Sequence, residues 1–268
     1  MNSQLVNKNG GKIRRIDVLG VGVDDLDERE VEREIVRLAK APGRGHYLVT
    51  INSEFVMMAH RNRKFAQILA KSDLAVADGW FVAKSRLICG GRFGERITGV
   101  DLIELASKIA DDKPIRIGYM GGFGDVAPSV AKRQLEIHPG IDVVYAKPGE
   151  PTISHDSRLK AELDAVGRID VLFVAFGMGK QEFWIDRMRG KLDIGLYIGV
   201  GGAFDYIAGK KRRAPEFMQK IGLEWLWRLV HDPVRIWRMR VLPIFAFLIF
   251  LKLCKKIFFR IFFQKITR

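Results

Sequence analysis

Residues 169–189, IDVLFVAFGMGKQEFWIDRMR, join an apolar run to a glycine turn and then to a segment with helical spacing. The run at 169–176 is rich in β-branched and aromatic residues, which is typical of a buried strand. Gly177 and Gly179 supply the turn, and the apolar residues after it recur at the spacing of an α-helix. This stretch therefore predicts a strand, a tight turn and a helix in succession.

The same unit recurs along the first 209 residues. Strands that alternate with helices predict parallel strands with crossover helices, so we expect a Rossmann-like α/β fold whose mostly parallel sheet is flanked by helices. The expected strands are residues 16–23, 46–51, 74–77, 115–120, 141–145, 169–176 and 196–200. The expected helices are residues 27–40, 53–70, 100–110, 125–136, 156–166 and 180–189.

Positive charge is concentrated at one end of the chain. The 268 residues are 48% apolar and 28% charged, as in folded proteins, and the formal net charge is +14. Residues 210–268 hold 15 Lys and Arg against three acidic residues, so they carry +12 of that charge. We therefore divide the chain into an α/β domain (1–209), a basic helical appendage (210–240) and a tail (241–268).

The cysteines and the N-terminus bear on the cellular compartment. Cys89 and Cys254 lie far apart in the sequence without metal-ligand spacing, which is typical of a reducing cytoplasm. Residues 1–15 are polar and contain no apolar segment of the kind that a secretory signal needs. We expect a protein that is made in the cytosol.

Glycines and small polar residues follow five of the expected strands. In a parallel sheet these positions meet at the carboxyl edge, where ligands bind. Glycines there allow a close approach of the backbone, and the helix N-termini favour phosphate, so we expect a nucleotide or sugar-nucleotide site. The residues concerned are Thr50, Asn52, Asp78, Gly121, Gly122, Gln181, Gly201, Gly202 and Asp205.

Two acidic motifs have competing interpretations. Asp78, in DLAVADGWF, either caps the helix that follows it or acts as a general base at the mouth of the site. Asp25 and Asp27 form a DxD pattern, which binds metal in many sugar-nucleotide enzymes, but they precede a helix and are interpreted as helix-start charge. The five histidines are scattered, and no cluster in the sequence has metal-ligand spacing, so we expect no metal site.

Six motifs, in this order along the chain, resemble the WecG/TagA/CpsF family of bacterial glycosyltransferases over residues 14–240. The motifs are TINSEFV (50–56), VADGWFV (76–82), RITGVDL (96–102), FGMGKQEFWI (176–185), IGVGGAFDYIAGKKRRAPEFMQKIGLEWLWRL (198–229) and DPVRIWR (232–238). The resemblance implies inverting, metal-independent transfer of an N-acetylmannosamine-type sugar or its uronic acid. The donor would be a UDP-sugar and the acceptor a polyprenyl-diphosphate-linked saccharide of cell-surface or exopolysaccharide synthesis. Ser53 departs from the family's usual proline.

The resemblance also implies roles for particular residues. Asp78 becomes the base that takes the proton of the acceptor hydroxyl, and Arg96 binds diphosphate charge. Thr50, Asn52, Gln181 and Asp205 line the nucleotide-sugar pocket, and the glycines at 121, 122, 201 and 202 fit the same pocket. Helix-start hydrogen bonding is the alternative interpretation of Gln181 and Asp205.

The basic appendage would close this site. Arg228, Arg235 and Arg238 are seven and then three residues apart, approximately one helical face, although Pro233 interrupts the helix. We expect these arginines to reach the diphosphate. A solvated basic face is the alternative, but tryptophans at 225, 227 and 237 are interleaved with the cations, as at a membrane interface.

The tail predicts a peripheral contact with the cytoplasmic face of the inner membrane. Residues 241–251 are apolar, which is too short for a span of about 20 residues. Lys252, Lys256 and Arg260 recur every four residues, with Lys255 beside them, opposite phenylalanines. An amphipathic helix on an anionic leaflet fits this pattern, and a transmembrane helix over 241–263 is the alternative.

Two other classes of protein share some of these features. A nucleic-acid-binding protein would also be basic and aromatic, but it would not need an apolar block after its basic helix. A nicotinamide-dependent oxidoreductase would use the glycine turns and needs a ribose-binding acid, for which Asp142 is the candidate. We therefore expect no cofactor beyond the UDP-sugar and no nucleic-acid partner, and a homo-oligomer remains compatible with the sequence.

Overall fold

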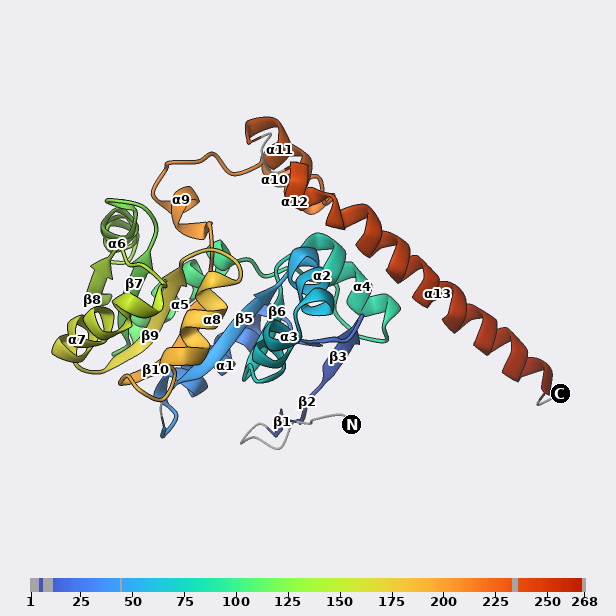
Figure 1. Ribbon diagram of the computed structural model, residues 1–268, viewed down its shortest axis with the longest axis horizontal. Coiled ribbons are helices and arrows are strands. Elements are labelled where there is room, and N and C mark those ends of the chain that lie inside the picture. Colours follow the sequence, from blue (N-terminus) through green and yellow to red (C-terminus); the bar gives the residue numbers. More distant parts are fainter. Residues whose placement is uncertain (1–4, 7–11, 44, 233–235, 267–268) are drawn as a thin grey trace.

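A six-stranded parallel sheet forms the centre of the computed structural model, which describes residues 5–6, 12–43, 45–232 and 236–266 (Figure 1). The strand order is β6-β5-β10-β9-β7-β8, and every neighbouring pair is parallel. The predicted α/β fold is therefore confirmed. The strands are β5 (His46–Ile51), β6 (Leu74–Ala77), β7 (Arg116–Gly121), β8 (Asp142–Lys147), β9 (Ile169–Ala175) and β10 (Ile194–Gly199).

Helices cover both faces of the sheet. One face packs against α2 (Ser53–Arg61), α3 (Arg63–Ala70), α7 (Asp156–Val166) and α8 (Lys180–Met188). The other packs against α1 (Glu28–Lys40), α5 (Gly99–Asp112), α6 (Val126–Ile137) and α9 (Ala203–Ile207). The chain leaves the neighbouring strands β5, β10 and β9 toward alternating faces, which opens crevices at their carboxyl ends.

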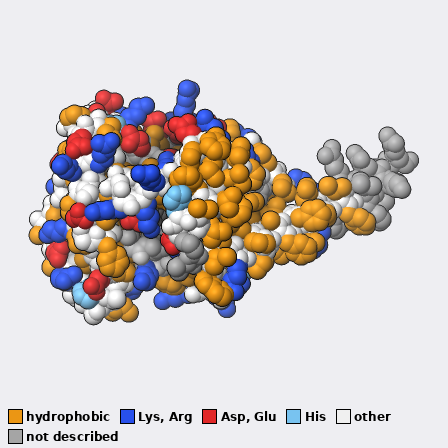
Figure 2. Space-filling model, turned by 90° about the horizontal axis from the view of Figure 1, so that it is seen from above, with side chains coloured by type: hydrophobic (Ala, Val, Ile, Leu, Met, Phe, Trp, Pro, Cys, Tyr) orange, Lys and Arg blue, Asp and Glu red, His pale blue; other side chains and the backbone are white. Residues whose placement is uncertain are grey.

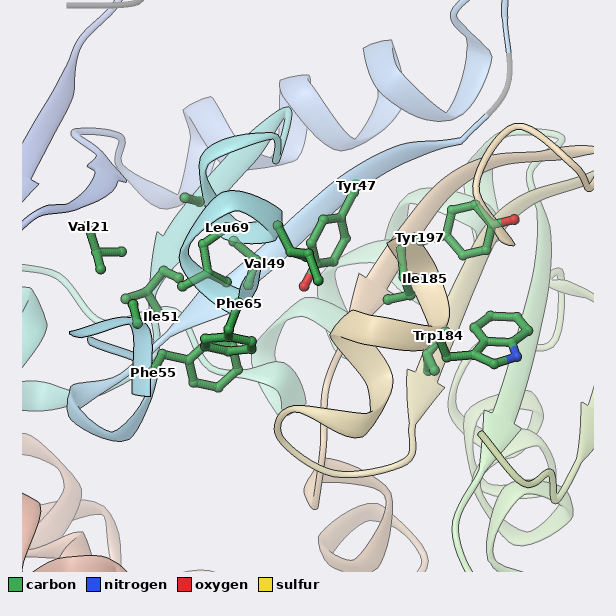
Figure 3. Packing of buried hydrophobic residues seen from close by; sticks show 14 of the residues in the cluster. Val21, Tyr47, Val49, Ile51, Phe55, Phe65, Leu69, Trp184, Ile185 and Tyr197 are labelled. Atoms are coloured by element: carbon green, nitrogen blue, oxygen red, sulfur yellow. The ribbon is translucent and has the colours of Figure 1, made fainter. Parts of the chain in front are cut away.

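The first of these faces buries a set of aromatic side chains. Tyr47 and Tyr197 extend from the sheet toward Trp184 and Ile185 of α8, while Phe65 of α3 lies against Phe55 (Figure 3). The Trp184 and Tyr197 rings meet edge to face, with their centroids 6.3 Å apart. Burial of such large side chains contributes strongly to packing and holds α8 against β10.

Residues 16–23 do not form one strand of the parallel sheet, so that prediction was wrong. They form the antiparallel hairpin of β3 (Arg15–Val18) and β4 (Val21–Asp24), next to β6. Leu19 and Gly20 both have positive φ, 52° and 81°, which suits a two-residue hairpin turn. A second hairpin pairs β1 (Leu5–Val6) with β2 (Lys12–Ile13).

The predicted helix over residues 53–70 is two helices. Asn62 has an extended backbone, φ −133°, and ends α2. Its side-chain oxygen then accepts a hydrogen bond from Phe65 N–H (3.0 Å) and caps α3. The helix expected after Asp78 is α4 (Trp80–Ile88), and a short 3₁₀ helix, η1 (Ile153–His155), precedes α7.

The described part of the appendage contains three short helices, which corrects the expectation of one arginine-bearing face. These are α10 (Glu216–Lys220), α11 (Glu224–His231) and α12 (Ile236–Met239). Arg228 lies on α11 and Arg238 on α12, whereas Arg235 falls outside the described residues. Separate helices allow the two described arginines to approach the domain at different places.

The tail is one helix, α13 (Val241–Ile266), which leaves the body diagonally (Figure 1). Its first half packs against α2 and α4 through the buried side chains of Phe245 and Ile249. Lys252 Nζ donates to Asp17 O and Oδ1 (both 2.9 Å), and Lys256 Nζ donates to Ile88 O (3.0 Å). These two lysines, expected at a leaflet, therefore contact the α/β domain.

We expect Phe245→Ala to release α13 from the domain. Phe245 is 1% exposed, and loss of a buried phenyl ring typically costs about 3–5 kcal/mol. Trypsin should then cleave near Lys252 and Lys256 faster than in the unmodified chain. Phe247, 59% exposed on the same helix, supplies the control Phe247→Ala. Equal cleavage rates in the two variants would contradict this packing.

Candidate functional site

Two cavities meet at the carboxyl ends of the strands and share a wall. The polar cavity, about 120 Å³, is bounded by the ends of β5, β9 and β10. The apolar cavity, about 110 Å³, lies between α4, the appendage and the start of α13. The shared wall contains Asn52, Glu54, Asp78 and Arg228. The apolar lining comprises Trp80, Phe81, Trp225, Met239 and Leu242.

The polar cavity opens into a wider hollow at the ends of β7, β9 and β10. Gly177, Gly201 and Gly202 border both spaces, and Gly122 lines the hollow beyond them. Gly121 lies just beneath, with φ 113°, where an added Cβ would come within 2.7 Å of Ala175 O. The glycine turns therefore keep the backbone close to any ligand in this space.

Asp78 lies at the junction of the two cavities. Its backbone N–H donates to Ile51 O (2.9 Å), which fixes the end of β6 against β5. Gly79 is the N-cap residue of α4, so Asp78 does not occupy the capping position. Burial of the Asp78 carboxyl raises its pKa to about 6, although Arg228 and Arg96 act in the opposite direction. A carboxylate with this pKa can accept a proton near neutral pH.

Thr50 and Asn52 combine structural contacts with a place in the cavity wall. Thr50 Oγ1 donates to Gly199 O (3.0 Å), which ties β5 to β10. Asn52 Oδ1 accepts from Glu54 N–H (2.9 Å) and Phe55 N–H (3.2 Å), which caps α2. Both residues line the polar cavity, as their positions at the carboxyl end of β5 predicted.

Gln181 and Glu182 hold the two glycine turns together. Gln181 Oε1 accepts from Gly201 N–H (3.0 Å), which ties the start of α8 to the turn after β10 in place of the alternative helix-start bond. Glu182 Oε2 accepts from Gly179 N–H (2.6 Å), and burial raises the pKa of Glu182 to about 7. Glu182 was not predicted, although its position three residues after Gly179 is that of a capping-box acid.

Arg96 and Arg228 meet on one buried carboxylate. Arg96 Nη1 lies 2.6 Å from Glu224 Oε2, and Arg228 Nη2 donates to Glu224 Oε1. The guanidinium of Arg228 also lies over the Tyr206 ring, 5.4 Å from its centroid. Burial alone would raise the pKa of Glu224, but Arg228 and Arg96 outweigh it and hold that pKa below its ordinary value. Glu224 was not predicted, and its spacing of four residues from Arg228 was the available signal.

The loop that carries Arg96 is held by the acidic motif near the N-terminus. Asp25 accepts from Arg92 N–H (2.7 Å) and from Phe93 N–H (3.1 Å), and its side chain is buried. Asp27 caps α1 through Glu30 N–H (2.7 Å), which confirms its interpretation as a helix-start acid. Both acids of the DxD pattern therefore have structural partners.

The remaining predicted residues lie around the hollow. Asp205 pairs with Lys211 (3.2 Å), and Arg238 Nη2 pairs with Glu54 Oε2 (2.7 Å) at the rim that the hollow shares with the polar cavity. Arg96 lines the apolar cavity, whereas Arg228 lines both cavities. The fold thus gathers the predicted residues at one edge, with Arg235 outside the described part of the chain.

Asp142 does not reach this edge. It begins β8, at the amino end of that strand, and pairs there with Arg116 (3.5 Å). The ribose-binding role that an oxidoreductase would require of Asp142 is therefore not supported. Across the residues that the structure describes, no group of three His, Cys, Asp or Glu side chains is arranged to hold a metal ion.

The structure is that of an α/β protein with cavities at the carboxyl ends of its parallel strands, beneath a helical appendage. Residues 16–258 match the sequence profile of the "Glycosyl transferase WecG/TagA/CpsF family". The match spans most of the chain, and the protein belongs to this family. It is therefore a glycosyltransferase.

Similar proteins include three enzymes named N-acetylglucosaminyldiphosphoundecaprenol N-acetyl-beta-D-mannosaminyltransferase. The one from Bacillus spizizenii is 32% identical over 75% of this chain and 77% of its own length. The one from Bacillus subtilis is 29% identical over 84% of this chain and 83% of its own length. The Staphylococcus aureus enzyme is 26% identical over 87% of this chain and 91% of its own length.

We expect Asp78→Asn to stabilise the fold at alkaline pH. Because the folded pKa, about 6, lies above the ordinary 3.8, the folded state binds more protons between these values, and stability falls as pH rises through that window. Removing the charge should therefore raise the free energy of unfolding by about 1–2 kcal/mol at pH 8. The gain should shrink as the pH is lowered toward 4.

Urea unfolding at several pH values measures this effect. Asp164, exposed on α7 and paired with Lys160, gives the control Asp164→Asn, which should show no such gain. If Asp78→Asn is less stable than the unmodified chain at pH 8, burial of the charged Asp78 carboxylate does not destabilise the folded state.

Proposed function

We propose that this glycosyltransferase moves an N-acetylmannosamine-type sugar, or its uronic acid, from UDP to a polyprenyl-diphosphate-linked saccharide. The reaction would serve the synthesis of a cell-envelope polysaccharide or exopolysaccharide. The names of the similar enzymes support both the sugar and the lipid-linked acceptor. The observation that carries the proposal is the position of Asp78, between a polar and an apolar cavity.

The donor would bind on the polar side. Glycine turns after β7, β9 and β10 border the polar cavity and its hollow, and close backbone approach there suits a diphosphate. Arg228 and Arg238 add positive charge to the same wall. Fixed cations and backbone donors can stabilise departing UDP, so the proposed transfer is metal-independent, with the UDP-sugar as its only small-molecule requirement.

Asp78 would act as the base in a single displacement. The acceptor hydroxyl oxygen attacks the anomeric carbon as the bond from that carbon to the UDP oxygen breaks. The hydroxyl proton passes to Asp78, and the negative charge leaves with UDP toward the arginines. Attack opposite to the departing oxygen inverts the configuration of the anomeric carbon.

The acceptor would enter from the apolar side and from the membrane. Trp80, Phe81 and Trp225 line the apolar cavity, which reaches the first turn of α13 through Leu242. Figure 2 shows hydrophobic side chains gathered along α13 and over the adjoining face of the body. Among the described helices, none combines the length and the apolar character that a bilayer crossing requires. We infer a peripheral contact with the cytoplasmic face of the membrane.

A transfer assay tests the reaction itself. The full chain is incubated with a synthetic polyprenyl-diphosphate N-acetylglucosamine and either UDP-N-acetylmannosamine, its uronic acid or UDP-N-acetylglucosamine, and products are identified by mass. We expect one of the two mannosamine-type donors to give product, in the presence of EDTA, with inverted stereochemistry. Transfer solely from UDP-N-acetylglucosamine, or dependence on added magnesium or manganese, would contradict the proposal.

Within that assay, Asp78→Asn should abolish transfer and leave UDP affinity within a few-fold. The carboxamide keeps the shape of the side chain but cannot accept the acceptor's proton, and loss of a general base typically costs about 10²–10⁴ in rate. UDP affinity is measured by calorimetry. Turnover close to that of the unmodified chain would assign Asp78 a structural role.

Membrane contact is expected to depend on the exposed phenylalanines of α13. Phe247 and Phe250 are 59% and 58% exposed, and burial of a phenyl group is worth roughly 1.5–3 kcal/mol. The double change to glutamine should weaken binding to anionic phosphatidylglycerol vesicles at least about tenfold in a sedimentation assay. Ile153, 76% exposed in η1, gives the control Ile153→Gln. Equal binding by both variants would exclude α13 as the contact.

A further inference from the structure

Glu224 is an anion enclosed between two cations beside the proposed base. Only 5% of the residue is exposed, and its two carboxylate oxygens separately contact Arg96 and Arg228. Arg96 belongs to the loop before α5, and Arg228 belongs to α11 of the appendage. The carboxylate therefore joins the α/β domain to the appendage at the wall that contains Asp78.

The chain is shaped to bring Glu224 to this position. Gly222, two residues earlier, has φ 82°, and an added Cβ would lie 2.5 Å from the Trp80 ring. A glycine there lets the start of α11 approach α4 closely. Gln219 adds a second contact to Arg96, with its Oε1 3.3 Å from Nη2. The ion cluster thus depends on the docked position of the appendage.

The charges around Asp78 show what Glu224 offsets. Arg96 and Arg228 face Asp78 and lower its pKa, while Glu224 and Asp101 raise it. Asp101 already pairs with Arg213 (3.1 Å), and Glu54, on the shared wall, pairs with Arg238 (2.7 Å). Without Glu224, the guanidinium groups of Arg96 and Arg228 would lose the carboxylate that pairs with both of them, and their positive charge would lower the pKa of Asp78 further. A more acidic Asp78 would be a weaker base.

We propose that Glu224 is a positioning residue for the transfer: it holds Arg96 and Arg228 beside Asp78 and balances their charge so that Asp78 retains the strength of a base. This inference rests on the proposed function of the same site. Arginines fixed before the substrate arrives do not have to reorganise as charge develops on the departing diphosphate. The balance exists only when the appendage is docked, so docking and base strength are coupled.

The variant Glu224→Gln tests this role, because glutamine keeps the size of the side chain and removes its charge. We expect kcat/KM to fall at least about tenfold, since small misplacements of charged groups in a site carry costs of this order. Only ionised Asp78 accepts a proton, so kcat/KM rises with pH through its pKa. Loss of the Glu224 charge should move this acid limb to lower pH.

Glu216→Gln is the matched control. Glu216 lies on the same appendage in an exposed pair with Lys220 (3.6 Å), away from both cavities, and its variant should retain the rate and the pH profile. Glu224→Asp keeps the charge and should preserve the position of the acid limb even if the rate falls. A profile and kcat/KM of Glu224→Gln equal to those of Glu216→Gln would overturn the inference.

A second measurement needs no substrate. The Asp78 carboxyl is followed by ¹³C NMR titration, with its signal assigned from the spectrum of Asp78→Asn. Glu224→Gln should move this titration to lower pH, whereas an unchanged titration would overturn the charge-balancing role. If the unmodified chain makes no product but the titration moves as expected, the proposed function fails and the role of Glu224 in the site stands. If Glu224→Gln does not fold, the same titration is made on Arg96→Gln, which should move it to higher pH because Arg96 lowers the pKa of Asp78. A titration that stays in place would overturn the charge-balancing role.

Discussion

One buried carboxylate shared by two arginines joins the α/β domain to the helical appendage. Glu224 contacts Arg96, whose loop is anchored by Asp25, and Arg228, which lies on the helix of Glu224 itself. A buried ion cluster of this kind is stable only while all its partners are present, because an uncompensated buried charge costs several kcal/mol. The closed arrangement around Asp78 therefore depends on this cluster, and so does the division of the space into a polar and an apolar cavity.

The parallel sheet accounts for the position of the polar cavity. Because neighbouring strands β5, β10 and β9 send the chain to alternating faces, their carboxyl ends leave a crevice that glycine turns can line. Gln181 and Glu182 fix those turns from one short helix segment. In the proposed function, the glycine turns of the α/β domain would bind the phosphorylated donor, and the appendage would cover the site on the side from which the acceptor enters. Asp78 is the residue at which these two parts meet.

The parallel sheet and the location of the site could be predicted from the sequence. The carboxyl ends of parallel strands lie at the same edge of a sheet, so the residues there come together in the fold. The positions of Thr50, Asn52, Asp78 and Gln181 at the polar cavity were predicted in this way, although the hydrogen bonds of Thr50 and Gln181 depend on partners distant in the sequence. The hairpin at residues 16–23 was not predicted because its turn needs a positive φ at Leu19, and leucine rarely adopts that conformation. Glu224 was missed because one acid in a basic segment reads as surface charge until its burial is known.

Hydrogen–deuterium exchange of the full chain, with and without saturating UDP, tests the central claim most directly. A donor site at the carboxyl ends of the strands predicts that UDP slows exchange in the turns that border the polar cavity and its hollow. These turns are residues 121–124, 177–181 and 201–206. Protection there, with residues 129–137 of α6 unchanged, would support a donor site at the carboxyl ends of the strands. Protection confined to α6, or no protection at all, would contradict it.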